Sequence, residues 1–154
     1  MSKRKMTLLI LLILFVAIQF IRPTKNINGI VTASRFSNLY NPPASIDNIL
    51  QMACYDCHSN NTRYPWYANI QPAGWILQSH ITKGKSELNF DEFATYSARR
   101  KLSKLKSIIS QVNDGEMPLQ SYTWIHKDAR LSDEQKKILL TWVKKTMDSL
   151  TAKQ

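Results

Sequence analysis

Cysteine is scarce in this chain, because only two of its 154 residues are cysteines. A small secreted fold held by disulfides needs several pairs, so two cysteines do not make such a framework. No segment of convincing length alternates apolar and polar residues, and the sequence contains no internal repeat. Apolar residues recur at helical spacing instead. The sequence therefore predicts an all-α protein.

Acidic residues are also few relative to basic ones: 21 Lys and Arg against 11 Asp and Glu give a formal net charge of +10. A basic surface steers a protein toward acidic partners, nucleic acid or anionic lipid, and charge alone does not choose among them. The densest basic run is Arg99–Lys101, with Lys104 and Lys106 following. This run is typical of a solvated helix face, and it is also a candidate docking surface for an acidic partner protein.

An apolar run without a polar face occupies Met6–Ile21 and follows three basic residues. A basic start before such a run is typical of a signal sequence or a signal anchor. As a helix the run would extend roughly 24 Å, slightly less than the ~30 Å hydrocarbon core of a bilayer. Lys5 and Arg22 at its ends are long enough to reach the headgroups. The run therefore predicts a membrane segment at residues 1–23.

The fate of this segment depends on cleavage. The one fair site for a signal peptidase is Val31-Thr32-Ala33, which lies late after the run. We therefore expect an uncleaved single-pass anchor in the cytoplasmic membrane. The basic residues before the run would keep the N-terminus in the cytoplasm, with the domain on the periplasmic side. Cleavage would instead give a soluble periplasmic protein.

The rest of the chain divides into a linker at residues 24–43 and a domain at residues 44–154. The linker has little periodicity and ends in Tyr40-Asn41-Pro42-Pro43, which favours extended backbone. Within the domain, Ser132 and Gln135 have the spacing of a capping box and predict the start of the last helix. Earlier helices are expected to begin at Ser45, at Ala73 with an end at Gly84, and at Asp91 with an end near Val112.

The sequence Cys54-Tyr55-Asp56-Cys57-His58 falls at the end of the first helix of the domain. In a Cys-x-x-Cys-His motif the two thiols add to the vinyl groups of haem as thioethers, and the histidine binds the iron. We therefore predict one covalently attached haem c on Cys54 and Cys57, with His58 as an axial ligand. An exported chain agrees with this chemistry, because cytochrome c maturation takes place outside the cytoplasmic membrane.

Three other chemistries use a pair of cysteines at this spacing. A zinc site would need a second pair of ligands, which the sequence lacks, although His80 and His126 are available. A thioredoxin-like redox pair would need a βαβ context, and a simple disulfide would need only the two thiols. The histidine directly after the second cysteine favours haem over all three.

A second iron ligand is expected in the sequence Gly115-Glu116-Met117-Pro118. A methionine in a loop before the last helix is a common sixth ligand, because a thioether raises the potential of the haem. Gly115 permits an unusual turn and Pro118 stiffens it. Met117 is therefore the predicted sixth ligand, with His126 and His80 as alternatives. Further haem contacts are sought among the aromatic and basic side chains Arg63, Trp66, Tyr67 and Tyr122, with Tyr64, Trp75 and Trp124 as weaker candidates.

The order of these motifs resembles the small single-haem cytochrome c fold. More closely, CYDCHSNNTRYPWYANIQP together with GEMPLQSYTWIH is similar to the bacterial membrane-anchored haem-binding domain family of cytochrome-c-like proteins. The resemblance covers about Pro42 to Leu150. It implies a small cytochrome-c-like helical domain around one covalently attached haem, preceded by an N-terminal apolar helix.

We expect the protein to be a membrane-tethered single-haem electron carrier rather than an enzyme. Its redox partner would be a protein, acidic if the basic run docks it. The alternative is a peroxidase-like haem enzyme or a haem-based sensor, either of which needs an open or displaceable sixth position. A peroxidase would also need a distal acid or base, for which His126 is the candidate. Nucleic acid is not an expected partner, because only the net charge points to it.

Overall fold

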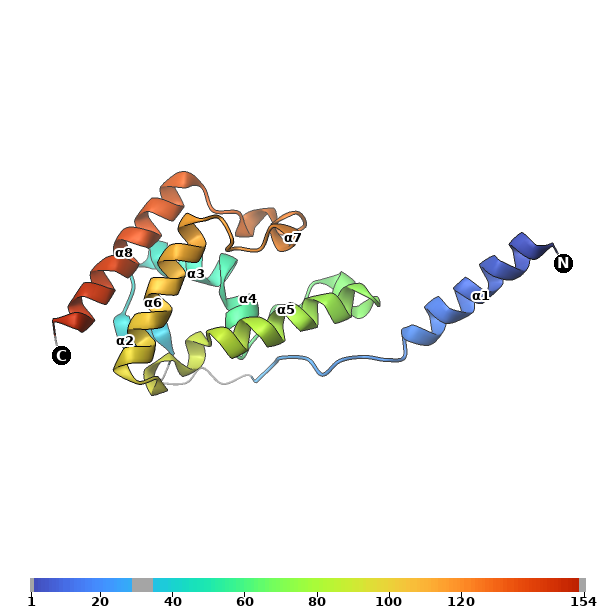
Figure 1. Ribbon diagram of the computed structural model, residues 1–154, viewed down its shortest axis with the longest axis horizontal. Helices are drawn as coiled ribbons and strands as arrows, with labels where there is room; N and C mark the ends of the chain where they lie inside the picture. Colours follow the sequence, from blue (N-terminus) through green and yellow to red (C-terminus); the bar gives the residue numbers. More distant parts are fainter. Residues whose placement is uncertain (1, 29–34, 153–154) are drawn as a thin grey trace.

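The computed structural model describes residues 2–28 and 35–152, and this part of the chain is helical, without a strand (Figure 1). Its one extended pairing is an isolated bridge between Ile27 and Asn61. The prediction of an all-α protein is confirmed for these residues. The helices are α1 (Lys3–Ile18), α2 (Phe36–Tyr40), α3 (Ala44–Ala53), α4 (Tyr55–His58), α5 (Ala73–Glu87), α6 (Ala98–Asn113), α7 (Gln120–Thr123) and α8 (Asp133–Thr151), with 3-10 turns at Trp66–Asn69, Phe90–Thr95 and Lys127–Ala129.

Helix α1 contains the predicted apolar run as far as Ile18, has no buried residue and stands apart from the other helices (Figure 1). The chain after it is tied to the start of α5. Gln19 Nε2 donates to the carbonyl of Gln71 at 3.1 Å, and Trp75 Nε1 donates to the carbonyl of Ile21 at 2.8 Å. Among the described residues, no helix has both the length and the apolar character needed to cross a membrane. The candidate cleavage site at 31–33 lies outside the described residues.

The segment expected to be a linker contributes to the core. Phe36 on α2 is fully buried, and its ring meets the edges or faces of Tyr40, Phe90, Phe93 and Trp142 at centroid separations of 4.8 to 5.7 Å. Helix α2 is only one turn long, so its single core residue leaves no periodic signal in the sequence. Folded structure therefore begins before residue 44.

The main core lies between α3, α6 and α8, and Figure 1 shows α6 and α8 side by side. Helix α8 begins as predicted: Ser132 Oγ accepts from the Gln135 N–H at 3.1 Å, and Gln135 Oε1 accepts from the Ser132 N–H at 2.9 Å. Helix α3 begins one residue before Ser45, with Pro43 as its N-cap. The expectation of Ser45 as the cap is wrong, because the Pro43 carbonyl already accepts the first N–H groups of the helix.

Two other helix boundaries also differ from the expectation. Helix α5 continues through Gly84 to Glu87, and a Cβ on Gly84 would lie 2.7 Å from the carbonyl oxygen of Cys57. Gly84 therefore serves the close approach of two helices, not a helix end. Asp91 does not cap α6, which begins after Ser97. Asp91 is buried instead, where it accepts from the Asn60 N–H at 2.7 Å and pairs with Arg35 at 3.4 Å.

Candidate functional site

An apolar cavity of about 360 Å³ opens between α3, α6 and α8, within the size range of ligand pockets. Helix α3 and the chain after it contribute Cys54 and His58, and the loop after α6 contributes Met117. The predicted thiol, imidazole and thioether therefore reach one cavity from two separate parts of the sequence. Its other lining residues are Leu50, Ala53, Glu87, Leu88, Phe90, Lys104, Ser107, Ile108, Gln111, Val112, Pro118, Leu131 and Leu139.

The two cysteines lie where α3 gives way to α4. Cys54 ends α3 with its N–H bonded to the Leu50 carbonyl at 3.0 Å, and its own carbonyl accepts from the His58 N–H at 3.0 Å. The two thiols are not joined to each other. Burial raises the pKa of Cys54 to about 12 and that of Cys57 to about 11, so both are protonated at neutral pH. Cys54 lines the cavity, whereas Cys57 packs against a second apolar cluster, formed by Ala68, Leu77 and Ile81.

His58 is held in one orientation by the end of α5. Its Nδ1 lies 3.0 Å from the carbonyl oxygen of Leu88, so Nδ1–H donates and Nε2 is the nitrogen available to a metal. Burial lowers the pKa of His58, and the ring is accordingly neutral at neutral pH. A neutral, oriented imidazole is the form that binds haem iron.

Met117 reaches the cavity because the chain makes a tight turn directly after α6. Gly115 has a φ of 74°, which a residue with a side chain adopts only with strain. The carbonyl of Gln111 then accepts from the N–H groups of Glu116 at 2.9 Å and Met117 at 3.0 Å. In the Gly-x-Met-Pro sequence, Gly115 thus turns the chain and Met117 lines the cavity.

The two rival histidines do not line this cavity. His126 Nε2 is 2.7 Å from the hydroxyl of Tyr67, and its ring stacks on Tyr122 with centroids 4.1 Å apart. His80 is half-buried on α5. Within the described residues, no three His, Cys, Asp or Glu side chains gather to hold a metal ion, so the zinc alternative finds no support there.

The aromatic and basic residues predicted as haem contacts are not among the cavity lining. Trp66 is 75% exposed, and Tyr67 bonds His126. Arg63 and Tyr122 both turn to Asp56, the residue between the two cysteines. The sequence shows the chemistry of these residues but not their partners in the fold. Arg63 and Tyr122 bond Asp56, and Tyr67 bonds His126.

Asp56 is only 7% exposed and organises what we call the Asp56 network, formed with Thr62, Arg63 and Tyr122. Its Oδ1 accepts from the Arg63 N–H at 3.1 Å and from Arg63 Nε at 3.2 Å, and its Oδ2 accepts from the Tyr122 hydroxyl at 2.8 Å. The Thr62 hydroxyl donates to the Asp56 carbonyl at 2.6 Å. The hydrogen bond to Asp56 raises the pKa of the Arg63 guanidinium. The network therefore fixes the cysteine motif through Asp56, whereas Cys54 of the same motif lines the cavity.

Sequence reasoning missed the polar part of the cavity lining. Lys104, Ser107 and Gln111 all come from one face of α6, and Glu87 comes from the end of α5. Their spacing of three and four residues beside Ile108 is the signal that could have identified them, since it places them on the face that turns inward.

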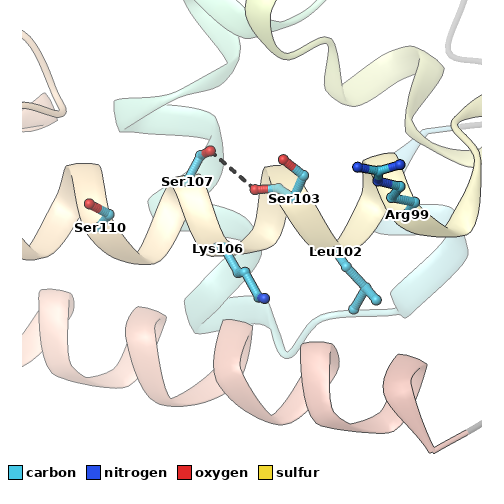
Figure 2. Close-up of a pocket in the computed structure, with 6 residues that line it drawn as sticks. All are labelled: Arg99, Leu102, Ser103, Lys106, Ser107 and Ser110. Atoms are coloured by element: carbon cyan, nitrogen blue, oxygen red, sulfur yellow. Dashed lines mark hydrogen bonds between the residues drawn. The ribbon is translucent and has the colours of Figure 1, made fainter.

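A second hollow lies along α6 and holds neither a cysteine nor a histidine. Figure 2 shows its lining residues, with Lys106 and Leu102 directed to the side of the neighbouring helix and Ser107 to the other side. Ser107 Oγ donates to the carbonyl of Ser103 at 3.1 Å. The volume of this hollow is about 740 Å³, but it is an open groove rather than an enclosed cavity. We therefore assign the site to the cavity that contains Cys54, His58 and Met117.

A helical domain with a buried thiol, an oriented imidazole and a thioether around one apolar cavity belongs to the class of small cofactor-binding helical proteins. The chain is a member of the haem-binding domain family, whose model matches residues 13–145. The match includes both cysteines, His58 and Met117. No curated protein and no solved structure matches the chain significantly.

Proposed function

We propose that this haem-binding protein is a c-type electron carrier. One haem is attached through thioethers to Cys54 and Cys57, with His58 and Met117 as its axial ligands. The observation that carries the proposal is that Cys54, His58 and Met117 line the same apolar cavity although a long stretch of sequence separates the motif from the methionine. The family membership supplies the haem, and the Cys-x-x-Cys-His spacing supplies the covalent attachment.

The cavity-lining Cys54, His58 and Met117 fit this cofactor, whereas Cys57, which does not line the cavity, would have to turn toward it to form the second thioether. Haem supplies the one-electron redox chemistry when bound, and the chain sets its ligation and surroundings. The Leu88 carbonyl orients His58, and the Gln111 carbonyl holds the loop that carries Met117. The apolar lining would keep water away from a bound haem, and together with the Met117 thioether it would favour the reduced state.

An electron carrier is favoured over the enzyme or sensor alternative by the position of His126. A peroxidase needs a distal acid or base beside the open iron position. His126, the candidate from the sequence, is instead bonded to Tyr67 and stacked on Tyr122 outside the cavity lining. Met117 occupies the cavity where such a group would be required.

We further propose that α1 attaches the domain to the bacterial cytoplasmic membrane, with the haem on the periplasmic side. The apolar part of α1 has no polar face and no buried residue, so its exposure to water is unfavourable and its insertion into a bilayer is favoured. The basic residues before it favour retention of its start in the cytoplasm. Carbonate extraction tests this proposal, because an attached protein stays with the membrane pellet and a cleaved or soluble one is released.

The central experiment is expression of the full chain with cytochrome c maturation machinery, followed by denaturing electrophoresis and a haem stain. We expect a stained band at the mass of the protein. Cys54→Ser and Cys57→Ser should each weaken the stain, and the double variant should abolish it. A wild-type haem that is extracted completely into acidified organic solvent would rule out covalent attachment. It would leave only non-covalent haem binding.

A further inference from the structure

The polar side chains of the haem cavity are not spread around its wall. Glu87, Lys104, Ser107 and Gln111 come from the end of α5 and one face of α6. The lining contributed by α3, α8 and the chain around Phe90 is apolar except for Cys54 and His58. The cavity therefore has a polar edge that the cysteine motif does not form.

Haem has the same asymmetry. Its two vinyl groups lie on one half of the porphyrin, and its two propionates lie on the other half. If thioethers fix the vinyl half at Cys54 and Cys57, the propionates must extend away from α4. Buried or half-buried carboxylates need a cation or hydrogen-bond donors, because an unpaired charge outside water is costly.

Lys104 is the cation that the described part of the cavity offers to such a carboxylate. Its side chain is 21% exposed, whereas its present partner Glu87, at 3.3 Å, is 79% exposed. The ammonium group is thus held at the cavity edge by a carboxylate that lies mainly in solvent. An exposed ion pair of this kind contributes little and exchanges readily.

The other basic side chains near the motif are committed elsewhere. Arg63 bonds Asp56 through Nε and a terminal nitrogen, both at 3.2 Å. Lys106 lines the open groove along α6 and points toward the neighbouring helix, away from Ser107 (Figure 2). The Ser107 hydroxyl already donates to the Ser103 carbonyl, which leaves the Gln111 amide as the second donor on the cavity edge.

We propose that Lys104, assisted by Gln111, binds the haem propionates on the inner face of α6. This assignment rests on the proposed function, since it needs a haem whose vinyl half is fixed at the cysteines. It makes Lys104 a positioning residue that sets the tilt of the haem against α6 and places a positive charge beside it. A nearby positive charge favours the reduced haem, and Glu87 opposes that effect.

The test uses resonance Raman spectra of the matured full-length protein, in which the propionate-bending bands report hydrogen bonding of the carboxylates. Lys104→Met should shift these bands and lower the midpoint potential, and Lys104→Arg should restore both. Gln111→Leu should give a smaller shift of the same kind. Lys106→Met is the matched control two residues away on α6, outside the cavity lining, and it should leave the bands unchanged. Ser107→Ala should also leave them unchanged.

The outcomes separate this proposal from the one on which it depends. A wild-type protein without covalent haem would remove the proposed function itself. Covalent haem with the same propionate bands in Lys104→Met and wild type would overturn the propionate assignment alone. If Lys104→Met does not accumulate, Glu87→Gln tests the same assignment by a change at an exposed residue. It should raise the potential and shift the bands by freeing Lys104, and unchanged bands would again overturn the assignment.

Discussion

The two sides of the cysteine motif have opposite character. On the side of Cys54, apolar residues of α3, α6 and α8 surround a cavity, and His58 is fixed by one bond to a backbone carbonyl. On the side of Cys57, the Asp56 network and the Tyr67–His126 pair fill the space between the 3-10 turn at Trp66–Asn69 and α7 with hydrogen bonds. One side is left open for a ligand, and the other is closed by polar contacts.

This difference separates the residues that determine the chemistry from those that determine rigidity. A cavity lined by apolar side chains contributes less to stability than a filled core, because its walls lose packing partners. The Asp56 network offsets that loss by fixing the motif from behind. Changes on the cavity side should therefore alter the haem more than the fold, and changes on the network side should do the reverse.

Met117→Ala should have the largest effect on the iron. In the proposed ligation, loss of the thioether would open the sixth position while Cys54, Cys57 and His58 would still hold the haem. The ferric spectrum should lose any methionine-to-iron band, the midpoint potential should fall, and the ferrous protein should bind carbon monoxide readily. Optical titration of the ferrous protein with carbon monoxide measures this change.

The matched control is His126→Ala, which removes a histidine that lies outside the cavity lining. Its spectrum should keep the wild-type axial ligation. If His126→Ala opens the iron and Met117→Ala does not, bis-histidine ligation replaces the proposed pair. If the wild type already binds carbon monoxide freely, the enzyme or sensor alternative gains over the electron carrier.

Asp56→Ala should have the largest effect on stability. The change leaves the Tyr122 hydroxyl and the Arg63 N–H without their acceptor. Unsatisfied buried donors cost about 1 to 3 kcal/mol each, so the free energy of unfolding should fall by about 3 kcal/mol. The ion pair with Arg63 adds little, because that side chain is largely exposed. Chemical denaturation followed by far-UV circular dichroism gives the value.

The comparison between the two sides predicts that Asp56→Ala keeps the wild-type haem spectrum below its unfolding transition. Tyr122→Phe, which removes one of the network's donors, should lose about 1 kcal/mol and keep the same spectrum. A change of axial ligation in Asp56→Ala as large as that in Met117→Ala would mean that the network also positions the ligands. The separation of roles between the two sides would then fail.

Much of the fold was predictable from local sequence. Apolar periodicity gave the helical class, and the capping box at Ser132 gave the start of α8. The Gly-x-Met-Pro sequence indicated a turn that carries a methionine, and the structure has one with Gly115 at positive φ and Met117 in the cavity. These features depend on contacts within a few residues, which a single sequence contains.

Most of the errors depend on distant contacts. Phe36 looked like part of a linker, but it is buried against rings from two other segments, the 3-10 turn at Phe90–Thr95 and α8. Asp91 looked like a helix cap, but it bonds Arg35 and Asn60. Arg63 has the chemistry of a propionate partner, yet Asp56 lies closer in the fold. Periodicity and residue type do not report which polar partner a side chain will meet.

Gly84→Ala should have an intermediate effect on the free energy of unfolding. Gly84 lies on α5 against Cys57, so the change acts on the cysteine motif itself. The added Cβ would meet the Cys57 carbonyl oxygen at 2.7 Å and the Cys57 Cβ at 3.3 Å, so α5 or α4 must move. Overpacking of this kind costs about 1 to 3 kcal/mol, partly offset by the better helix propensity of alanine, which is worth about 1 kcal/mol. We expect a net loss of about 1.5 kcal/mol in the free energy of unfolding.

Ser79→Ala is the control for this change, because Ser79 is an exposed residue of the same helix. It should leave the stability unchanged or slightly higher. The Gly84 variant should also lower the yield of covalent haem in the haem stain, since the displaced backbone carries a reacting thiol. A Gly84→Ala protein as stable as wild type, with full haem attachment, would show that the two helices separate easily.

The smallest effect is expected from the contact that closes the polar side. The Tyr67 hydroxyl and His126 Nε2 are 2.7 Å apart, and they join the 3-10 turn at Trp66–Asn69 to the chain after α7. Tyr67→Phe removes this bond and keeps the ring beside Cys57. A single neutral hydrogen bond contributes about 1 kcal/mol, and the free energy of unfolding should fall by that amount.

A double-mutant cycle with His126→Phe separates this hydrogen bond from the stacking of His126 on Tyr122. If the two residues interact, the effects of the two substitutions on the free energy of unfolding should be less than additive. Full additivity would mean that the two residues contribute separately. A shift of the midpoint potential in Tyr67→Phe would instead assign this pair to the haem site, and the boundary between the two sides of the motif would have to move to include it.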